Sequence, residues 1–443
     1  MARRRQKLKP MPAGAFPGHV ESLDHDGRGV AHVDGKATFI EGALPGEEVR
    51  FKYLTQHKKF DEGYVTDIIQ SSSDRVEPKC PHFDICGGCS LQHMDAAAQI
   101  QAKQQIMLDN FKHIGNVVPE EILPPLTASH WGYRRKARLG CRYVFKKASM
   151  LVGFRERRSG LLAELSRCEV LHPAIGERIM ALRELVGSLQ AYKRMPQIEV
   201  AIGDDVVALV FRNLDELVEQ DIERLVQFGQ DNHIHIYLQP KGPDSAYRLW
   251  PAQSQLSYRL DEFDLEMLFE PTDFTQVNAE INRKMVSRAV TMLDPQPSER
   301  VLDLFCGLGN FSLPLARKAG HVIGVEGEAG LVQRAHANAA HNRVSNAEFH
   351  AADLAQEPHQ HPWFGAGFDK LLIDPPRSGA FEIVKHVPAF GAGRVLYVSC
   401  NPATLARDAQ VLVEAGYRLK AAGVMDMFPH TTHVESMALF EQG

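Results

Sequence analysis

The carboxyl half of the chain alternates short apolar runs with helical stretches, and this alternation constrains the fold more than any other feature. The runs cover residues 301–305, 321–325, 371–374 and 395–399. Short continuous apolar runs are typical of strands buried on both faces, and helices between them are the crossovers that parallel strands need. From about residue 271 the sequence therefore predicts an α/β domain with a parallel, doubly wound sheet that binds ligands at the carboxyl ends of its strands.

The first of these runs ends in a glycine-containing loop that is suited to a cofactor. Gly307 and Gly309 let the backbone turn sharply and approach a ligand closely. The third glycine of the dinucleotide pattern is missing, and no Lys-Ser/Thr pair follows to bind a phosphate. Glu326, at the end of the second strand, can accept hydrogen bonds from ribose hydroxyls, and Asp353, after the next strand, can meet an adenine amino group. The set favours S-adenosylmethionine, and the alternative is an ordinary tight turn.

The loop at 373–379 reads Ile-Asp-Pro-Pro-Arg-Ser-Gly and follows the run at 371–374. Its prolines hold Asp374 and the backbone carbonyls rigidly toward a substrate base. Amino-group methyltransferases usually end such a loop in an aromatic residue, and Arg377 in that place disfavours N-methylation. RNA cytosine-C5 enzymes often place a cysteine here, and this loop has none.

Two further residues supply a reaction at C5 of uracil. Cys400 lies on the strand-to-helix turn after the run at 395–399, where we expect it to be exposed and its thiolate to be favoured by the helix N-terminus. Attack of Cys400 on C6 would make C5 nucleophilic enough to take a methyl group, and Glu435, just before a strand at 437–440, is the expected general base. Taken alone, the two residues could be a packed strand cysteine and a solvated loop carboxylate. His430 and His433 are expected to be ordinary polar neighbours.

The amino-terminal half has a different organisation. Residues 18–68 contain short strands with Asp34-Gly35 as a hairpin signal, which predicts a small closed or partly open β-barrel. A helix is expected over 96–114, and strand patterns dominate from about 131 to 270. No apolar run is long enough to span a membrane, and no apolar segment follows the basic start to make a secretory signal. At roughly 100–200 residues per domain, the length predicts about three domains.

The seven cysteines include three close together, as Cys80-x5-Cys86-x2-Cys89. An odd count without an export signal favours a reducing cytoplasm, with metal-binding or catalytic cysteines in place of disulfides. Three neighbouring thiolates fit tetrahedral zinc or an iron–sulfur cluster, and spacing alone does not separate the two. A fourth ligand must come from elsewhere: Cys168 lies in a loop-like setting, whereas Cys141 is expected in a strand of the core, and Cys306 is also expected to be structural.

The net charge of -5 is the sum of two unlike parts. Residues 1–160 hold 25 Lys and Arg against 18 Asp and Glu, and the remainder holds 25 against 37. A basic front favours RNA as a partner, with Lys52, Lys58 and Lys59 contacting phosphates. Tyr133, beside the basic run at 134–136, is expected to offer a stacking surface to single-stranded RNA. The alternative for each basic run alone is a solvated face.

With these residues assembled, nearly the whole chain resembles the TrmA/RlmD family of RNA uracil-5-methyltransferases, and within it the RlmD (RumA) type that acts on 23S rRNA. The resemblance rests on the barrel, the cysteines, the loops at 303–311 and 374–377, the segments around Cys400 and Glu435, and the motif Phe-Thr-Gln-Val-Asn at 274–278. Family members that modify tRNA are expected to lack the barrel and the cluster. The sister rRNA enzyme is expected to lack the barrel, so having both indicates the RlmD type.

The resemblance implies a multidomain protein: a TRAM-like (OB-like) RNA-binding β-barrel at 12–70, a central α+β domain with an iron–sulfur cluster at 71–270, and a Rossmann-like class I methyltransferase domain at 271–443. It implies a [4Fe-4S] cluster with Cys168 as the fourth ligand, Cys400 as nucleophile and Glu435 as base. The implied contacts to S-adenosylmethionine come from Gln276, Phe305, Asn310, Glu326, Asp353 and Asp374. At Asp353 relatives can carry Asn, and either side chain can hydrogen-bond adenine.

The implied activity is that of a cytoplasmic 23S rRNA (uracil(1939)-C(5))-methyltransferase. A monomer is expected to act on a single-stranded or loop uridine flipped out of the stack, with no membrane or DNA partner. Three alternatives stay open at this point: a uridine of another rRNA or of tRNA, a cytosine-C5 RNA methyltransferase, and a cluster-bearing RNA-binding or assembly factor. The absence of a loop cysteine argues against the cytosine enzyme, and Cys400 together with Glu435 argues against the assembly factor.

Overall fold

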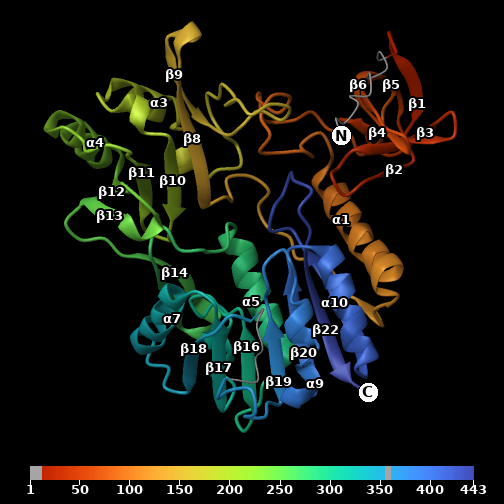
Figure 1. The fold of residues 1–443 in the computed structure, drawn as a ribbon, viewed down its shortest axis with the longest axis vertical. Helices are drawn as coiled ribbons and strands as arrows, with labels where there is room; N and C mark the ends of the chain where they lie inside the picture. Colours follow the sequence, from red (N-terminus) through yellow and green to blue (C-terminus); the bar gives the residue numbers. More distant parts are fainter. Residues whose placement is uncertain (1–11, 355–360) are drawn as a thin grey trace, which may run out of the picture. The chain divides into compact units, whose positions relative to one another are not determined.

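A computed structural model describes residues 12–354 and 361–443 of the chain (Figure 1). They form two compact units. The first contains the chain as far as Phe83, then Cys89–Ala102 and the short segment His430–Thr432. The second contains Asp84–Gly88, Lys103–Pro429 and His433–Gly443. Within the described ranges, no helix is long and apolar enough to cross a membrane.

The first unit is built on a curled, mostly antiparallel sheet in the order β1-β5-β6-β4-β3-β2. Its strands are β1 Phe16–His19, β2 Ser22–Leu23, β3 Gly29–Val33, β4 Lys36–Glu41, β5 Glu48–Gln56 and β6 Phe60–Gln70. Asp34 and Gly35 join β3 to β4 with φ angles of 51° and 76°, so the expected two-residue hairpin turn is confirmed. Because β1 also contacts β3, which is not its ladder neighbour, the sheet curls into a small, partly open barrel around Phe51.

The expected helix over 96–114 is present as α1 Ala96–Asn110, continued by one π-helical turn at Phe111–Gly115. Its first seven residues belong to the first unit and the rest to the second. Lys103, at the start of the second part, is buried, and its ammonium lies 2.8 Å from a carboxylate oxygen of Asp426.

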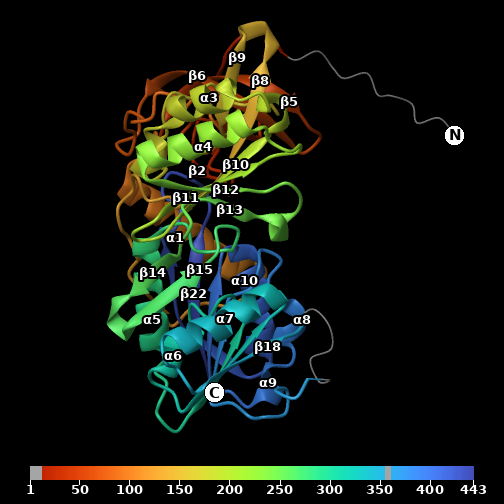
Figure 2. The ribbon, with the colours of Figure 1, turned by 90° about the vertical axis from the view of Figure 1, so that its left-hand side faces the viewer.

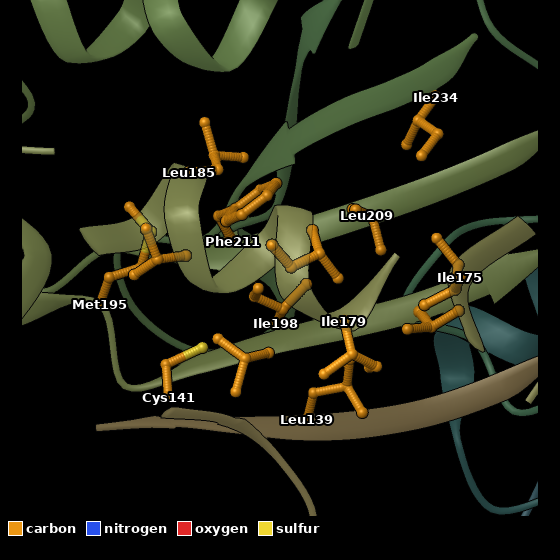
Figure 3. Packing of buried hydrophobic residues seen from close by; sticks show 14 of the residues in the cluster. Leu139, Cys141, Ile175, Ile179, Leu185, Met195, Ile198, Leu209, Phe211 and Ile234 are labelled. Carbon is orange, nitrogen blue, oxygen red and sulfur yellow. The ribbon is translucent and has the colours of Figure 1, made fainter. Parts of the chain in front are cut away.

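The second unit contains two larger sheets. One has the order β13-β12-β11-β10-β8-β9 and is covered on one face by helices α3 and α4 (Figure 2). Its elements are β8 Lys136–Val144, β9 Ser149–Gly153, α2 Pro173–Gly176, α3 Ile179–Ser188, β10 Gln197–Ile202, β11 Val207–Arg212, α4 Glu219–Asn232, β12 Ile234–Leu238 and β13 Tyr247–Trp250. Figure 3 shows the core between this sheet and its helices, where Leu139, Ile198 and Phe211 pack toward Ile179 and Leu185.

Cys141 lies in this core, and its burial raises the pKa of the thiol to about 12, in agreement with the structural role expected for it. The two helices α3 and α4 were not identified among the strand patterns of this region. The signal for α4 was nevertheless present in the sequence, because Ile222, Leu225 and Phe228 follow at helical spacing.

The other sheet has the order β18-β17-β16-β19-β20-β22-β21-β7. Its elements and neighbours are β7 Glu121–Ile122, the hairpin β14 Leu256–Leu260 and β15 Leu265–Phe269, α5 Ala279–Leu293, β16 Arg300–Leu304, α6 Ser312–Ala316, β17 His321–Glu326, α7 Ala329–His341, β18 Ala347–Ala351, β19 Lys370–Ile373, α8 Phe381–Val384, α9 Val387–Phe390, β20 Arg394–Ser399, α10 Pro402–Glu414, β21 Tyr417–Met425 and β22 Glu435–Gln442.

The four apolar runs of the sequence are β16, β17, β19 and β20, each within one residue of the expected bounds. These strands and β18 are parallel, as expected, so their carboxyl ends meet at one edge of the sheet. The last strand, β22, departs from this pattern because it is antiparallel to both β20 and β21. Its first residue, Glu435, therefore returns to the edge at which β20 ends, with Ser399 and Ser436 paired.

Candidate active site

The glycine loop after β16 has the conformation that a cofactor loop needs. Gly307 and Gly309 have φ angles of 55° and 95°, and a side chain added at Gly307 would meet no atom within 4 Å. The amide of Gly307 donates a 3.1 Å hydrogen bond to Glu326. Phe305, which precedes the loop, is itself left-handed at φ 65°, a conformation that is strained for an aromatic residue. The open space beside the glycines and the carboxylate at its rim fit a nucleoside cofactor.

Three carboxyl groups lie around this loop. Asp303 is fully buried and accepts a hydrogen bond from Ser312; burial, and then the charges of Asp374 and Glu326, raise its pKa to about 8. Burial and the charge of Glu326 raise the pKa of Asp374 to about 7. One oxygen of Asp303 accepts no hydrogen bond although it is buried. Like charges held this close favour a cationic ligand, and a sulfonium cofactor meets that condition.

Gln276 lies at a small pocket, whereas Asn310 is engaged within the protein. Gln276 and Thr275 line the pocket, together with Tyr258 and Asn282. Asn310 exchanges two amide hydrogen bonds with Asn282, at 2.9 and 3.1 Å, and its oxygen also accepts from the Tyr258 hydroxyl at 2.8 Å. Only the second amide hydrogen of Asn310 is then available for a cofactor.

The two other residues expected at the cofactor differ in their surroundings. Glu326 ends β17, and its two oxygens accept from the amides of Gly307 and Glu328, so its position is fixed by backbone groups. Asp353 follows β18 and is exposed, two residues before the part of the chain at 355–360 that the structure does not describe.

Cys400 follows β20 and is half-buried. Burial, and then the charges of Glu435 and Asp374, raise the pKa of its thiol to about 11, against the opposing effect of Arg377. The expectation that the helix N-terminus favours an exposed thiolate is therefore wrong: two carboxylates and partial burial outweigh the dipole of α10.

Glu435 is buried, with 7 % of its surface exposed, as the first residue of β22. The sequence places Glu435 just before the last strand, whereas it is the first residue of that strand. Because Glu435 is buried, it is not a solvated loop carboxylate. Burial, and then the charge of Asp374, raise the pKa of Glu435 to about 8, while Arg377 and Lys103 lower it. Cys400, Glu435 and Asp374 thus form one electrostatically coupled group at the edge of the sheet.

Sequence reasoning missed one side chain that acts on this group, Lys103, whose charge lowers the pKa of Glu435, and it named His433 only as a polar neighbour. A guanidinium nitrogen of Arg377 lies 3.1 Å from Nδ1 of His433. Burial and then Arg377 lower the pKa of His433 to about 4, so the ring stays neutral and accepts a hydrogen bond. Lys103 comes from α1, far away in sequence, and no local motif surrounds it.

Helix α10 holds the loop that carries Asp374 and Arg377. Asn401 and Thr404 donate to the carbonyl oxygen of Arg377 at 3.1 and 3.4 Å. The fully buried carboxylate of Asp408 accepts hydrogen bonds from Tyr397, Arg407 and the amide of Ala380. Arg407 donates in turn to the carbonyl of Ser378. We refer to Tyr397, Arg407 and Asp408 as the loop clamp.

The stacking surface expected around Tyr133 is not present. Tyr133 is buried, and its hydroxyl donates to the carbonyl of Pro429. Arg135 is bound to Asp204 at 2.7 Å, and Lys136 is bound to Glu199 at 3.3 Å. These residues are structural because each cation is matched by a carboxylate in the fold. Lys52, Lys58 and Lys59, by contrast, are exposed on the barrel, as a phosphate-binding role requires.

The four cysteines expected as metal ligands all lie in the part of the chain that the structure describes. Cys80, Cys86 and Cys168 are half-buried, and Cys89 is buried. The amide of Gly88 donates to the sulfur of Cys86 at 3.4 Å, the kind of hydrogen bond that tunes cluster thiolates. Cysteine thiolates are the usual ligands of iron–sulfur clusters. Cys306 is buried, and its burial raises the pKa of its thiol well above the usual value, which fits a structural role.

Comparison with known proteins identifies the class of enzyme. Residues 193–443 match the family model described as tRNA (Uracil-5-)-methyltransferase, and residues 19–52 match the TRAM domain. A solved structure, the Pyrococcus abyssi tRNA (uracil-54, C5)-methyltransferase in complex with S-adenosyl-L-homocysteine, is similar with a TM-score of 0.74 and 25% identity. That similarity covers 96% of this chain and 100% of that one. The chain belongs to this family, the S-adenosylmethionine-dependent RNA uracil-5-methyltransferases.

Within the family, the chain is similar over its full length to curated relatives called 23S rRNA (uracil(1939)-C(5))-methyltransferase RlmD. The relative from Hahella chejuensis is 52% identical over 450 residues and covers 100% of both chains. The relative from Nitrosococcus oceani is 56% identical and covers 98% of both. The Pyrococcus tRNA enzyme also matches almost the whole chain, so the expectation that tRNA enzymes lack the amino-terminal parts does not hold for it. Sequence identity, and not the architecture, separates the two types.

Proposed function

We propose that the protein transfers a methyl group from S-adenosylmethionine to C5 of uracil 1939 of 23S rRNA, the position in the names of its relatives. The observation that carries this proposal is the coupled group of Cys400, Glu435 and Asp374 at the strand edge that also bears the glycine loop. A nucleophile, a base and a cofactor loop in one place are what methylation of a weakly nucleophilic pyrimidine carbon requires.

Cys400 acts as the nucleophile in this proposal. Its sulfur forms a bond to C6 of uracil, the C5–C6 electron pair moves toward the C4 carbonyl, and the thiol proton passes to a neighbouring carboxylate. S-adenosylmethionine, when bound, supplies an electrophilic methyl group. Arg377, whose charge lowers the pKa of both Cys400 and Glu435, stabilises the negative charge that develops beside it.

Glu435 completes the reaction as the general base. After methylation, C5 carries both the methyl group and its original proton. Removal of this proton by ionised Glu435 restores the C5–C6 double bond and expels the Cys400 thiolate. Because its pKa is about 8, Glu435 is ionised in an appreciable fraction of molecules at neutral pH.

The cofactor is held by residues of the same edge. Glu326 binds the ribose hydroxyls, Asp353 the adenine amino group, and Asp374 lies beside the cationic end. Gln276, Phe305 and Asn310 complete the set from the pocket and the glycine loop. Phe274, next to this pocket, is 70% exposed and offers an aromatic face to a base.

The remaining parts serve RNA and the cluster. The barrel at 12–70 binds rRNA through exposed lysines, and the central domain at 71–270 carries a [4Fe-4S] cluster on Cys80, Cys86, Cys89 and Cys168. The methyltransferase domain spans 271–443. The protein acts as a monomer in the cytoplasm, where ribosomal RNA is found, on a uridine flipped out of the stack, because C6 is not accessible to a thiol within a stacked strand.

A tRNA uridine is the second candidate substrate, because the Pyrococcus tRNA enzyme matches nearly the whole chain. The deciding experiment offers labelled S-adenosylmethionine with unmodified 23S rRNA and with unmodified tRNA, and maps the product nucleotide. We expect 5-methyluridine at position 1939 of the rRNA only. Label in tRNA alone, or 5-methylcytidine in either RNA, would contradict the proposal. The Cys400→Ala variant is the control for label carried by contaminating enzymes.

A further inference from the structure

The turn between β8 and β9 carries an unusual group of aromatic rings. Residues Phe145–Lys147 form a 3-10 turn that projects beyond α3 and α4 in both ribbon views (Figures 1 and 2). Phe145 is 72% exposed. Its ring lies 5.2 Å from that of Tyr143, which in turn lies 4.9 Å from the ring of Tyr192. We call this group, with the neighbouring lysines, the hairpin tip.

Cations surround these rings. The ammonium of Lys193 lies 5.2 Å from the centre of the Phe145 ring and 5.3 Å from that of Tyr192. Lys146 is exposed and makes no ion pair within the described part of the chain, and Lys147 is paired with Glu164 at 2.5 Å. A single exposed phenylalanine is normal on a protein surface. An exposed ring beside several lysines has the composition of a single-stranded nucleic-acid site, in which bases stack on aromatics and phosphates meet cations.

The core of the sheet does not need Phe145. Tyr143 and Tyr192 are partly buried against the core cluster, whereas Phe145 is not part of it. Its ring is held by the two tyrosines and Lys193, so one face is presented to solvent at little further cost in side-chain entropy. The stacking surface predicted at Tyr133 is buried, and the hairpin tip is an exposed aromatic and basic surface of the same unit.

We propose that the hairpin tip is a second RNA-binding site, at which Phe145 stacks on an unpaired base and Lys146, Lys147 and Lys193 contact the flanking phosphates. This inference rests on the proposed function, since it takes the RNA substrate as the ligand. Lys136, at the start of β8, is paired with Ala201, next to the pocket-lining residue Ile202. Nine residues at about 3.3 Å each separate Lys136 from Phe145, roughly 30 Å. The tip therefore lies at the far end of β8 from the pocket that holds Gln276, a proposed cofactor contact, and we infer that the base bound there is a different nucleotide from the methylated uridine.

The test compares a long rRNA fragment with a short RNA that contains little more than the target uridine. Phe145→Ala should weaken binding of the long fragment about 5- to 150-fold and leave binding of the short RNA unchanged. Phe145→Trp should restore binding and show fluorescence quenching when the long fragment is added. Each lysine-to-alanine change should reduce the salt dependence of binding by about one counterion.

The matched control is Tyr247→Ala, which removes a half-exposed aromatic ring from β13, at the opposite edge of the same sheet. It should leave both affinities unchanged. Equal affinity of wild-type and Phe145→Ala protein for the long fragment would overturn the inference. That result would also be expected if the hairpin tip bound another protein and not RNA. Binding of the fragment through the tip without methylation of the 23S rRNA would instead overturn the proposed function, so the two failures are distinguishable.

Discussion

Cys400, the proposed nucleophile, has a thiol that is protonated at neutral pH. Its pKa of about 11 means that very little thiolate exists at neutral pH, which protects the nucleophile from oxidation and alkylation. Attack on C6 must then be coupled to proton transfer, because neither the helix dipole nor Arg377 is enough to ionise the thiol in advance.

The first prediction concerns this nucleophile. Cys400→Ala should lower methyl transfer by roughly 1000-fold or more, because no other group can activate C5, while affinity for RNA changes little. RNA with 5-fluorouridine at the target should form an adduct with wild-type protein that survives denaturing electrophoresis, since fluorine at C5 does not leave as a proton. A wild-type protein that methylates normal RNA but never forms this adduct would contradict the covalent mechanism.

The second prediction separates the base from the nucleophile. Glu435→Gln should still attack and methylate but should fail to remove the C5 proton, so that a methylated covalent complex accumulates on unmodified RNA. Gel electrophoresis with labelled cofactor detects this complex. Asp109→Asn, at an exposed carboxylate of α1, is the control and should turn over normally. Normal turnover of Glu435→Gln would exclude Glu435 as the base.

At the scale of single residues, the sequence predicts which side chains are candidates for the site, but it does not predict their ionisation. Cys400 and Glu435 could be proposed because each lies at a strand end, where ligands bind in sheets of this kind. Their pKa values depend on burial and on carboxylates brought from other strands, which no local pattern encodes. For the same reason Tyr133 was misjudged, because its exposure depends on Pro429, nearly 300 residues further along.

Among the elements, the strand-to-helix unit of β20 and α10 does more than present Cys400. The loop clamp joins α10 to the neighbouring loop at 374–379, and Gly379 is required there, because a side chain at its φ of 78° would lie 2.6 Å from Arg407. The nucleophile and the loop with Asp374 and Arg377 are therefore positioned by one helix.

The third prediction tests this clamp. Asp408→Asn removes the charge that binds Arg407, and hydrogen bonds to charged groups contribute about 1.5–3 kcal/mol each. We expect kcat to fall about 10- to 100-fold through displacement of Arg377, with a smaller change in KM for RNA. Tyr397→Phe, which removes the hydroxyl that donates to Asp408 and accepts from the Ala380 amide but keeps the Arg407 pair, should have a milder effect. An unchanged kcat in Asp408→Asn protein of wild-type stability would refute the positioning role.

Elements were predicted best where periodicity was strongest. The bounds of β16, β17, β19 and β20 follow from continuous apolar runs, and the β3–β4 hairpin follows from Asp34-Gly35. Helix α4 was missed because its polar face is long and its flanks look like strands. The antiparallel direction of β22 in the sheet could not be predicted, because an apolar run does not encode the direction of a strand.

For the whole molecule, buried carboxyl groups make stability depend on pH. The folded-state pKa values of Asp303, Asp374 and Glu435, about 8, 7 and 8, exceed their ordinary values near 4. Folded protein therefore binds more protons than unfolded protein between these limits, and stability falls as pH rises. Each group contributes up to about 1.4 kcal/mol per pH unit.

The fourth prediction follows from this sign. The melting temperature of the cofactor-free protein should decrease between pH 5.5 and 8, as measured by calorimetry. Asp303→Asn, which keeps a group able to bond Ser312, should flatten the decrease. A melting temperature that rises over this range would contradict the assignment of raised pKa values to these carboxyls.

The fifth prediction concerns the proposed cluster. Protein purified without oxygen should be brown, contain about four irons per chain, and lose both colour and iron on Cys86→Ser. Cys141→Ser, at the core thiol, is the control and should keep the iron. Stoichiometric zinc without iron would contradict the cluster. Spacing alone left zinc and iron open, since both accept thiolate ligands.

The segment His430–Thr432 belongs to the first unit but is synthesised near the end of the chain, and this affects when the first unit can finish folding. The amides of Ser90 and Leu91 donate to the carbonyl of His430, and the buried Gln99 exchanges hydrogen bonds with its backbone and ring. Gln99 and His430 are separated by 331 residues. At about 5–20 residues per second, the ribosome needs roughly 15–70 s to synthesise that interval. The barrel unit emerges first, yet it can complete its folding only when almost the entire enzyme has been translated.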